Sequence, residues 1–267
     1  MFNKKQQGWS DLTTYERRQS LLDLLKKQPG LRVPEIARML RVSDGTVRND
    51  LNALEKEGYL TRVHGGAVLL SSQEIAQQTF TSRHQENADK KSCVGKHAAS
   101  MVEDGDSILL DASSTAYYLA LNLKERNRLR VVTNGIEVAR LMAQNPSNTV
   151  ILIGGVVNQD GSSVTGLLSE QIIADLHIQK AFISCSGFSV ERGMTEVHLE
   201  EAQLKRKAIE SAQQIIALID SSKFGKEDLT PFARPKQITH LFTDAGITAE
   251  WKTRLQQANI PFTLCGE

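Results

Sequence analysis

The chain has 267 residues, of which 40% are hydrophobic and 24% charged, and its formal net charge is +1. This length is enough for two domains, and this composition is typical of a globular protein. The sequence contains no apolar run approaching the roughly 18 residues of a membrane span, no signal peptide and no cysteine spacing typical of disulfides or metal sites. We therefore expect a cytoplasmic protein that needs no metal or other cofactor.

The charge is spread unevenly along the chain. Residues 1–70 carry 12 lysines and arginines against 8 acidic residues, a net +4, whereas residues 71–267 carry 20 against 23, a net −3. A basic N-terminal part favours a contact with nucleic-acid phosphates there. An excess of four charges is too small for a protein that packages nucleic acid by charge alone, which leaves that class as the weakest alternative.

The N-terminal part predicts three helices followed by a hairpin. A capping-box pattern at Thr13–Glu16 opens a helix that continues to Lys27. Pro34–Leu40 predicts a second helix, and Ser43 caps a third that runs to about Glu57, where a glycine ends it. Two short apolar segments around a Gly-Gly pair then predict a hairpin over 59–70. This order is typical of a winged helix-turn-helix.

The third helix has one apolar face, carrying Val47, Leu51 and Leu54, and one polar face. In helix-turn-helix proteins the second helix of the motif enters the major groove, where arginine bonds guanine and asparagine bonds adenine. The predicted DNA contacts at the start of this helix are Ser43, Asp44, Thr46, Arg48 and Asn49. Additional backbone or wing contacts are predicted for Arg17, Arg18, Arg41, Arg62 and His64.

After residue 91 the pattern changes to apolar strands that alternate with helices. The predicted strands are 107–110, 130–133, 150–153, 181–184, 215–219 and 240–242. The predicted helices lie near 115–126, 136–144, 168–176, 199–213 and 248–258. Such alternation predicts an α/β domain with a mostly parallel sheet. We expect three parts: a DNA-binding domain over 1–72, a linker over 73–90 and an α/β effector-sensing domain over 91–267.

Small polar turns follow several of these strands, at the sheet edge where α/β proteins bind ligands. The turn Asp111–Thr115 precedes a helix, so it is either an oxyanion site at the helix N-terminus or an ordinary cap. The other predicted effector contacts are Thr133, Asn134, Gly135, Gly154, Gly155, Gly187, Glu201, Lys205 and Lys223, together with Ser113 and Ser114. Lys223 offers a cation to a phosphate, and Glu201 and Lys205 form either a surface ion pair or part of the cleft.

The N-terminal part resembles the head of the DeoR-type bacterial transcription regulators. The resemblance rests on Ile36–Leu40, Val42-Ser43, Thr46–Leu51, Leu54-Glu55, Gly58 and Arg62–Ala67. Many members carry a second arginine where this chain has Asn49, so the operator sequence is not carried over.

The rest of the chain resembles the sensor half of the same family. This resemblance rests on Thr133-Asn134, Gly154-Gly155, Gly166, Gly187, Glu201-Ala202, Lys205-Arg206 and Asp220–Phe224. It implies a fold similar to ribose-5-phosphate isomerase and the CoA transferases, and a phosphorylated sugar as effector. Many members have a glycine where this chain has Ser113.

The leading hypothesis is a repressor of a sugar-utilisation operon that binds double-stranded operator DNA as a homodimer or homotetramer and is switched by a phosphorylated sugar. The alternative is a sugar-phosphate isomerase-like enzyme that carries a DNA-binding head, with Asp111, Glu201 and Lys205 as acid–base groups. Fold alone does not decide between them. The sequence pairs no clear general base with a clear acid, which favours the regulator, and a regulator is not expected to catalyse a reaction.

Overall fold

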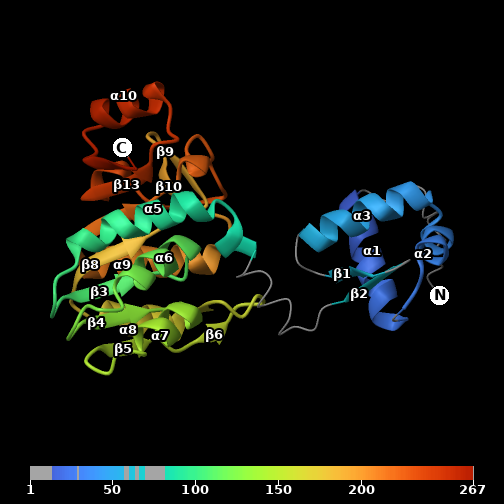
Figure 1. Ribbon diagram of the computed structural model, residues 1–267, viewed down its shortest axis with the longest axis horizontal. Coiled ribbons are helices and arrows are strands. Elements are labelled where there is room, and N and C mark those ends of the chain that lie inside the picture. Colours follow the sequence, from blue (N-terminus) through green and yellow to red (C-terminus); the bar gives the residue numbers. More distant parts are fainter. Residues whose placement is uncertain (1–13, 29, 57–59, 64–65, 70–81, 267) are drawn as a thin grey trace, which may run out of the picture. The chain divides into compact units, whose positions relative to one another are not determined.

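The computed structural model describes residues 14–28, 30–56, 60–63, 66–69 and 82–266. The chain forms two compact units, Met1–Ser82 and Arg83–Glu267. In Figure 1 the first unit is blue and the second runs from green to red. A linker was predicted over 73–90, but the second unit begins at Arg83. Arg83 and the residues after it contact the sheet domain and are therefore part of it.

The first unit contains the three predicted helices and the predicted hairpin. Its elements in chain order are α1 (Thr14–Lys27), α2 (Val33–Leu40), α3 (Asp44–Lys56), β1 (Leu60–Val63) and β2 (Gly66–Leu69). The two strands pair antiparallel, with Leu60 opposite Leu69. The described residues do not include Thr13, Glu57 and Gly58, which were predicted at helix ends, or His64 and Gly65, which were predicted in the wing.

A single apolar core holds these elements together. The side chains of Ile36, Leu40, Val47 and Leu51 are each fully buried in it. The turn between α2 and α3 is made by Arg41, whose φ of 54° reverses the chain. The apolar stripe predicted for α3 is therefore the stripe that the core covers, and the polar stripe is left on the outside.

The second unit is built on a seven-stranded sheet in which all neighbouring strands run parallel. The spatial order is β14 (Phe262–Cys265), β13 (His240–Asp244), β11 (Ala212–Leu218), β8 (Ile178–Ile183), β3 (Ser107–Leu110), β4 (Arg130–Thr133) and β5 (Thr149–Leu152). The predicted parallel α/β domain is confirmed. The edge strand β14 was not predicted.

Helices cover both faces of this sheet (Figure 1). One core contains residues of α8 (Leu167–Ala174), α9 (Leu199–Ser211) and α10 (Ala249–Gln257), and the other contains residues of α5 (Ala88–Ala98), α6 (Ser114–Asn122) and α7 (Ile136–Met142). Helix α5 was not predicted. No helix in the described part of the chain is long and apolar enough to cross a membrane.

Short elements stand beside the main sheet. Strands β6 (Val156–Val157) and β7 (Val164–Thr165) form one hairpin, and a three-stranded sheet joins β9 (Gly187–Ser189), β10 (Gly193–Glu196) and β12 (Thr230–Ala233). Three 3₁₀ turns complete the unit: η2 (Ala99–Met101), η3 (Ser221–Lys223) and η4 (Pro235–Gln237). Strands β6, β9 and β12 each follow a strand of the main sheet, so both small sheets lie beyond its carboxyl edge in the chain.

Candidate functional site

Helix α3 presents its polar residues on a rigid support. The Ser43 hydroxyl caps the helix by accepting a hydrogen bond of 3.1 Å from the Thr46 amide, and the two hydroxyl oxygens are 2.9 Å apart. Arg48, Asn49 and Asp44 are exposed. These side chains therefore project from a helix that the core fixes in place, which is the arrangement a major-groove contact requires.

Two of the predicted phosphate anchors already have a partner inside their own unit. The Arg17 Nε donates to Asp50 Oδ2 at 2.5 Å, and the Arg18 Nε lies 3.4 Å from Asp50 Oδ1. Asp50 is only 3% exposed, so the two guanidinium groups balance a buried carboxylate. The sequence did not reveal this structural role, because it joins residues of α1 and α3 that are far apart in the chain. Arg41, by contrast, is exposed.

The wing arginine is held against α3. Its amide donates to Glu55 Oε1 at 2.6 Å, and Arg62 Nη1 donates to Asn52 Oδ1 at 2.5 Å. These contacts fix the hairpin relative to the third helix. Arg62 is half-buried, and the guanidinium is therefore positioned beside the polar face of α3.

In the second unit, the predicted effector residues gather at the carboxyl edge of the sheet. Asp111 follows β3, Asn134 follows β4 and Lys223 follows β11, which are all parallel strands. Gly135 allows two of these turns to touch, because a Cβ at this position would lie 2.9 Å from the Cα of Ala112. The remaining glycines lie on the same edge: Gly154 and Gly155 after β5, and Gly187 at the start of β9.

Lys205 of α9 is the centre of a buried ionic cluster. Its Nζ lies 2.6 Å from Glu196 Oε2 and 3.4 Å from Asp111 Oδ2, and it donates to the Ser184 carbonyl at 3.0 Å. Burial alone would lower the pKa of Lys205, but attraction to Glu196 and Asp111 outweighs it and raises the pKa above its ordinary value. The ammonium is therefore permanently charged.

The carboxylates in this cluster are equally constrained. Burial acts to raise the pKa of Glu196, but the charge and hydrogen bond of Lys205 lower it to about 2. Asp111, 2% exposed, accepts from the Ser184 amide at 2.9 Å and the Ser113 amide at 3.1 Å. These partners hold the Asp111 carboxylate in place, which leaves it little freedom to act as a general base.

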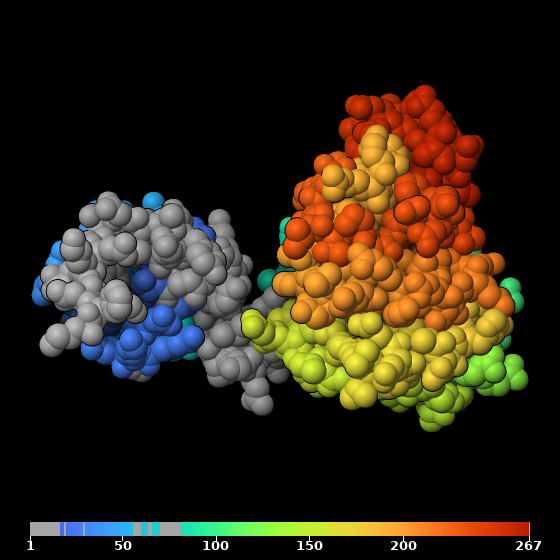
Figure 2. Space-filling view, turned by 180° about the vertical axis from the view of Figure 1, so that it is seen from behind, coloured from blue at the N-terminus to red at the C-terminus, as the bar shows by residue number. Residues whose placement is uncertain are grey.

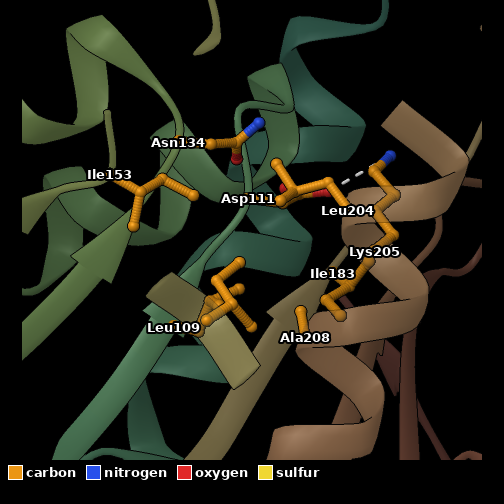
Figure 3. A pocket seen from close by; sticks show the side chains of 9 residues that line it. Leu109, Asp111, Asn134, Ile153, Ile183, Leu204, Lys205 and Ala208 are labelled. Atoms are coloured by element: carbon orange, nitrogen blue, oxygen red, sulfur yellow. Dashed lines mark ion pairs between the residues drawn. The ribbon is translucent and has the colours of Figure 1, made fainter. Parts of the chain in front are cut away.

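This cluster forms the polar end of a small pocket. Figure 3 shows Asp111, Asn134 and Lys205 grouped at one end and aliphatic side chains, among them Leu109 and Ile183, at the other. The remaining lining residues are Ile153, Ile173, Leu204 and Ala208. The cavity has a volume of about 10 Å³, room for about one water molecule, so these side chains pack against one another and leave no space for a sugar phosphate in this conformation.

Glu201 belongs to a second polar group beside the pocket, so it is not a surface partner of Lys205. Its Oε1 accepts from Ser163 Oγ at 2.5 Å and from Asn158 Nδ2 at 2.9 Å, and its Oε2 accepts from Asn134 Nδ2 at 3.4 Å. Asn158 and Ser163 lie on either side of the β6–β7 turn. Glu201 therefore ties α9 to that turn and to the end of β4.

A third polar group surrounds η3. Lys90 Nζ donates to Ser221 Oγ at 2.8 Å, and Asn87 Nδ2 donates to Ser222 Oγ at 3.4 Å. Asp220 is fully buried, and its Oδ2 has no hydrogen-bond partner among the described residues. Lys223 is half-buried here and does not line the pocket of Figure 3, so the predicted effector residues divide between two neighbouring places.

The turn Asp111–Thr115 forms a cap in this structure. Ser113 Oγ accepts from the Ala116 amide at 3.0 Å and donates to Asp111 Oδ1 at 2.5 Å. Ser114 and Thr115 are buried. Ser113 therefore caps α6 and bonds to Asp111 through its amide and its hydroxyl, whereas anion binding at this helix N-terminus stays a prediction.

Several residues of the site could not be found from the sequence. Glu196 contacts Lys205, and Ser184 contacts Asp111, only because the tertiary fold brings them together. No spacing in the sequence indicates either contact. Asn158 and Ser163 had a weak signal, since they flank a turn that contains Gly161 with φ 64°. Among the described residues, no three His, Cys, Asp or Glu side chains gather in a way that would hold a metal ion.

Comparisons with known proteins agree with the geometry of both units. The family model of the DeoR-like helix-turn-helix domain matches residues 17–73, and that of the DeoR C-terminal sensor domain matches residues 86–245. The chain belongs to the DeoR family of transcriptional regulators. The two family domains cover most of its length, which confirms the resemblance stated from the sequence.

The chain is also similar to individual transcriptional regulators. It is 37% identical to the HTH-type transcriptional regulator GolR of Listeria innocua, over 92% of this chain and 97% of that protein. It is 35% identical to the lactose phosphotransferase system repressor of Streptococcus mutans, over 86% of this chain and 91% of that protein. The family is regulatory, and these relatives are named as regulators rather than enzymes.

Among solved structures, ribose-5-phosphate isomerase A of Methanocaldococcus jannaschii aligns with 52% of this chain and 55% of its own, at 21% identity and a TM-score of 0.39.

Proposed function

We propose that this protein represses a sugar-utilisation operon in the cytoplasm and that a phosphorylated sugar bound to the second unit controls it. The main support for DNA binding is the exposed face of α3. Arg48 and Asn49 project from this helix, and the buried side chains of Val47 and Leu51 fix it to the core. The names of relatives support the regulatory half, since one is a lactose phosphotransferase system repressor and another the putative aga operon transcriptional repressor of Escherichia coli.

The carboxyl edge of the sheet has the chemistry to bind a sugar phosphate. Asn134 and Glu201 offer amide and carboxylate groups to sugar hydroxyls, while Lys223 and Lys90 offer ammonium groups to a phosphate. Lys205 is already neutralised by Glu196 and Asp111, so it acts by fixing these turns rather than by binding the phosphate. The cations left for an anion are thus those around η3.

The segment that begins the second unit gives this site a route to the DNA-binding unit. Arg83 Nη2 donates to Asp160 Oδ2 at 2.8 Å and to Ser162 Oγ at 2.7 Å, in the same β6–β7 turn that Glu201 holds through Ser163. Lys90, in the same segment, contacts η3. A ligand that moves either turn changes the anchoring of the residues that connect the two units, and it shifts the balance by its differential affinity.

The DNA-binding half is tested by fluorescence anisotropy of the full chain on labelled DNA from its own gene neighbourhood at moderate salt. We expect specific binding that Arg48→Ala weakens and Arg126→Ala leaves unchanged. Arg126 is exposed in the second unit, so its removal costs the same charge without touching α3. Equal loss in both variants, or no sequence preference in the wild type, would contradict the proposal.

The effector half is tested by repeating that titration with hexose and pentose phosphates and with the unphosphorylated sugars. We expect one phosphorylated sugar to weaken operator binding and its unphosphorylated form to have no effect. Lys223→Met is expected to raise the effector concentration needed, whereas Lys226→Met, exposed and three positions further, is the matched control. Turnover of any sugar phosphate by the purified protein would instead support the isomerase alternative.

A further inference from the structure

The second unit begins with a helix that is broken once. Residues 82–85 are helical, and α5 starts at Ala88. In Figure 1, α5 runs across the front of the second unit, whereas Figure 2, seen from behind, shows mainly the yellow and orange segments of α8 and α9 on the other face. Asn87, between the two helical stretches, has a φ of 53° and a ψ of 35°, the left-handed conformation that non-glycine residues rarely adopt. The sequence from 82 to 98 contains no proline, so the conformation of Asn87 is what interrupts the helix.

The side chain of Lys91 occupies two main-chain carbonyls at this break. Its Nζ donates to the Arg83 carbonyl at 2.5 Å and to the Glu86 carbonyl at 2.6 Å. In an unbroken α-helix, the same two carbonyls would accept from the amides four residues further on, those of Asn87 and Lys90. The Lys91 side chain is 5% exposed, so a buried ammonium takes the place of main-chain donors that the broken helix does not supply.

The turn η3 holds the break from the other side. Asn87 Nδ2 donates to Ser222 Oγ at 3.4 Å, and Lys90 Nζ donates to Ser221 Oγ at 2.8 Å. Both donors belong to residues whose main chain would change if the helix became continuous. The same turn contains Lys223, so the proposed phosphate position and the break share one support.

The broken and the continuous helix exchange one set of hydrogen bonds for another. In the broken form, the amides of Ala88, Asp89 and Lys90 form the first turn of α5 and have no acceptor within that helix, and the Asn87 side chain does not cap them. The continuous form would give these amides the carbonyls of residues 84–86 and would release Asn87 from the left-handed conformation. It would lose the two bonds to η3 and those of Lys91. Neither form has a large advantage, which is what a switch requires.

We propose that residues 82–98 form a two-state helix, broken at Asn87 while η3 holds it and continuous once an anion at η3 takes over the contacts of Lys90. This inference rests on the proposed function, because it assigns the regulation of the same site. A phosphate competes for the η3 hydroxyls and for the Lys90 ammonium, and thereby frees Asn87. Closing the break changes the direction of residues 82–85 relative to α5. It therefore also acts on Arg83, which bonds to Asp160.

The two-state helix is tested by two variants with opposite preferences at one residue. Asn87→Ala and Asn87→Gly both remove the bond to Ser222, but alanine disfavours the left-handed conformation and favours helix, whereas glycine does the reverse. The measurement is hydrogen exchange of the full chain, without DNA or ligand, resolved to the amides of Ala88, Asp89 and Lys90. These amides gain helical acceptors only in the continuous form, so we expect exchange to be about tenfold slower in Asn87→Ala than in Asn87→Gly.

Control by η3 is tested by a second pair of variants and by an anion. Lys90→Met removes the bond to Ser221 and should slow exchange of the same amides, whereas Lys96→Met, exposed on the same helix, should leave it unchanged. Inorganic phosphate, compared with chloride at equal ionic strength, should slow exchange in the wild type. In Lys223→Met this effect of phosphate should be lost, because the cation beside η3 is gone.

Equal exchange in Asn87→Ala and Asn87→Gly would overturn the two-state helix. Equal exchange in Lys90→Met and Lys96→Met, or rates in the wild type that phosphate leaves unchanged, would overturn its control by η3. Exchange of the β8 amides in the same experiment reports global unfolding, and all rates are compared relative to it. A chain that binds no operator DNA would contradict the proposed function but would leave these rates as they are, so the two failures are distinguishable.

Discussion

The predicted functional residues of the two units have opposite surroundings. Those at the start of α3 are exposed, and Arg48 and Asn49 project away from the core that holds their helix. Those of the second unit are largely buried and bonded to each other, as Lys205 is to Glu196 and Asp111. Side chains that contact DNA must be exposed, so that their hydrogen-bond donors can reach the bases and phosphates. Polar side chains of a ligand pocket must instead be held in place by other residues before the ligand binds.

This difference predicts which property a substitution damages. In the first unit, changes on the polar face of α3 should weaken binding and spare stability. In the second unit, changes in the ionic cluster should reduce stability, because a buried charge loses its partner. The first unit also contains a buried charge, because Asp50 pairs with Arg17 and Arg18. The contrast between exposed binding residues and buried structural charges therefore separates the surfaces of a unit from its interior, and not one unit from the other.

The largest expected effect is that of Glu196→Gln. Lys205 would keep Asp111 but lose its 2.6 Å partner while remaining buried. We expect the free energy of unfolding to fall by about 3–5 kcal/mol, measured by urea denaturation. Glu210→Gln is the control, since Glu210 pairs with Lys207 on the surface and should change stability by less than about 1 kcal/mol. Equal effects would mean that the cluster is not buried as described.

The same carboxylate predicts a pH dependence. The pKa of Glu196 in the folded protein is about 2, below its ordinary 4.5, because Lys205 favours the ionised form over the cost of burial. Its contribution of about 3 kcal/mol is therefore fully present above pH 4.5 and is lost as the pH falls towards 2. Denaturation measured at several acidic pH values should show this loss in the wild type and a smaller one in Glu196→Gln.

Arg48→Ala should separate binding from stability in the first unit. We expect operator binding to weaken by about 1–3 kcal/mol, with relaxed specificity at one base pair, because an arginine contact to a base edge is lost. The thermal midpoint should stay within experimental error, since Arg48 is exposed. A marked fall in the thermal midpoint would contradict the claim that the polar face of α3 contributes to DNA binding and not to stability.

Ser43→Ala should have the smallest effect and should act through the helix. The hydroxyl caps α3 by accepting from the Thr46 amide. Loss of such a cap costs about 1 kcal/mol of stability. Ser43→Asp, which retains an acceptor at the cap, should restore the thermal midpoint. Failure of this rescue would show that the hydroxyl does more than cap the helix.

The first unit could be predicted closely from the sequence, because its signals are local. The spacing of Val47, Leu51 and Leu54 defines the buried face of α3, and Ser43 marks its start. The pairing of Arg17 and Arg18 with Asp50 was missed, since a surface arginine and one that neutralises a buried acid look alike in sequence. Local patterns therefore give the helices but not the partners of their charged side chains.

In the second unit, the parallel sheet and the edge that carries the site were predictable, but the contacts within the site were not. The turns after β3 and β4 were found because small polar residues follow apolar strands. The bonds from Asp111 to Ser184 and from Lys205 to Glu196 depend on which strands become neighbours. Helix α5 was missed because Ala88–Ala98 is rich in lysine and gives a weak apolar stripe.

The strand order of the sheet has a consequence for synthesis on the ribosome. Strand β3 lies between β4 and β8, and Leu109 pairs with Ala181, so the middle of the sheet cannot form until β8 has emerged. The first unit is made of neighbouring segments and is complete by Leu69. Local contacts form faster than distant ones. We expect each nascent chain to acquire its DNA-binding helices before it can sense any metabolite, so control over the operator begins only when translation is nearly finished.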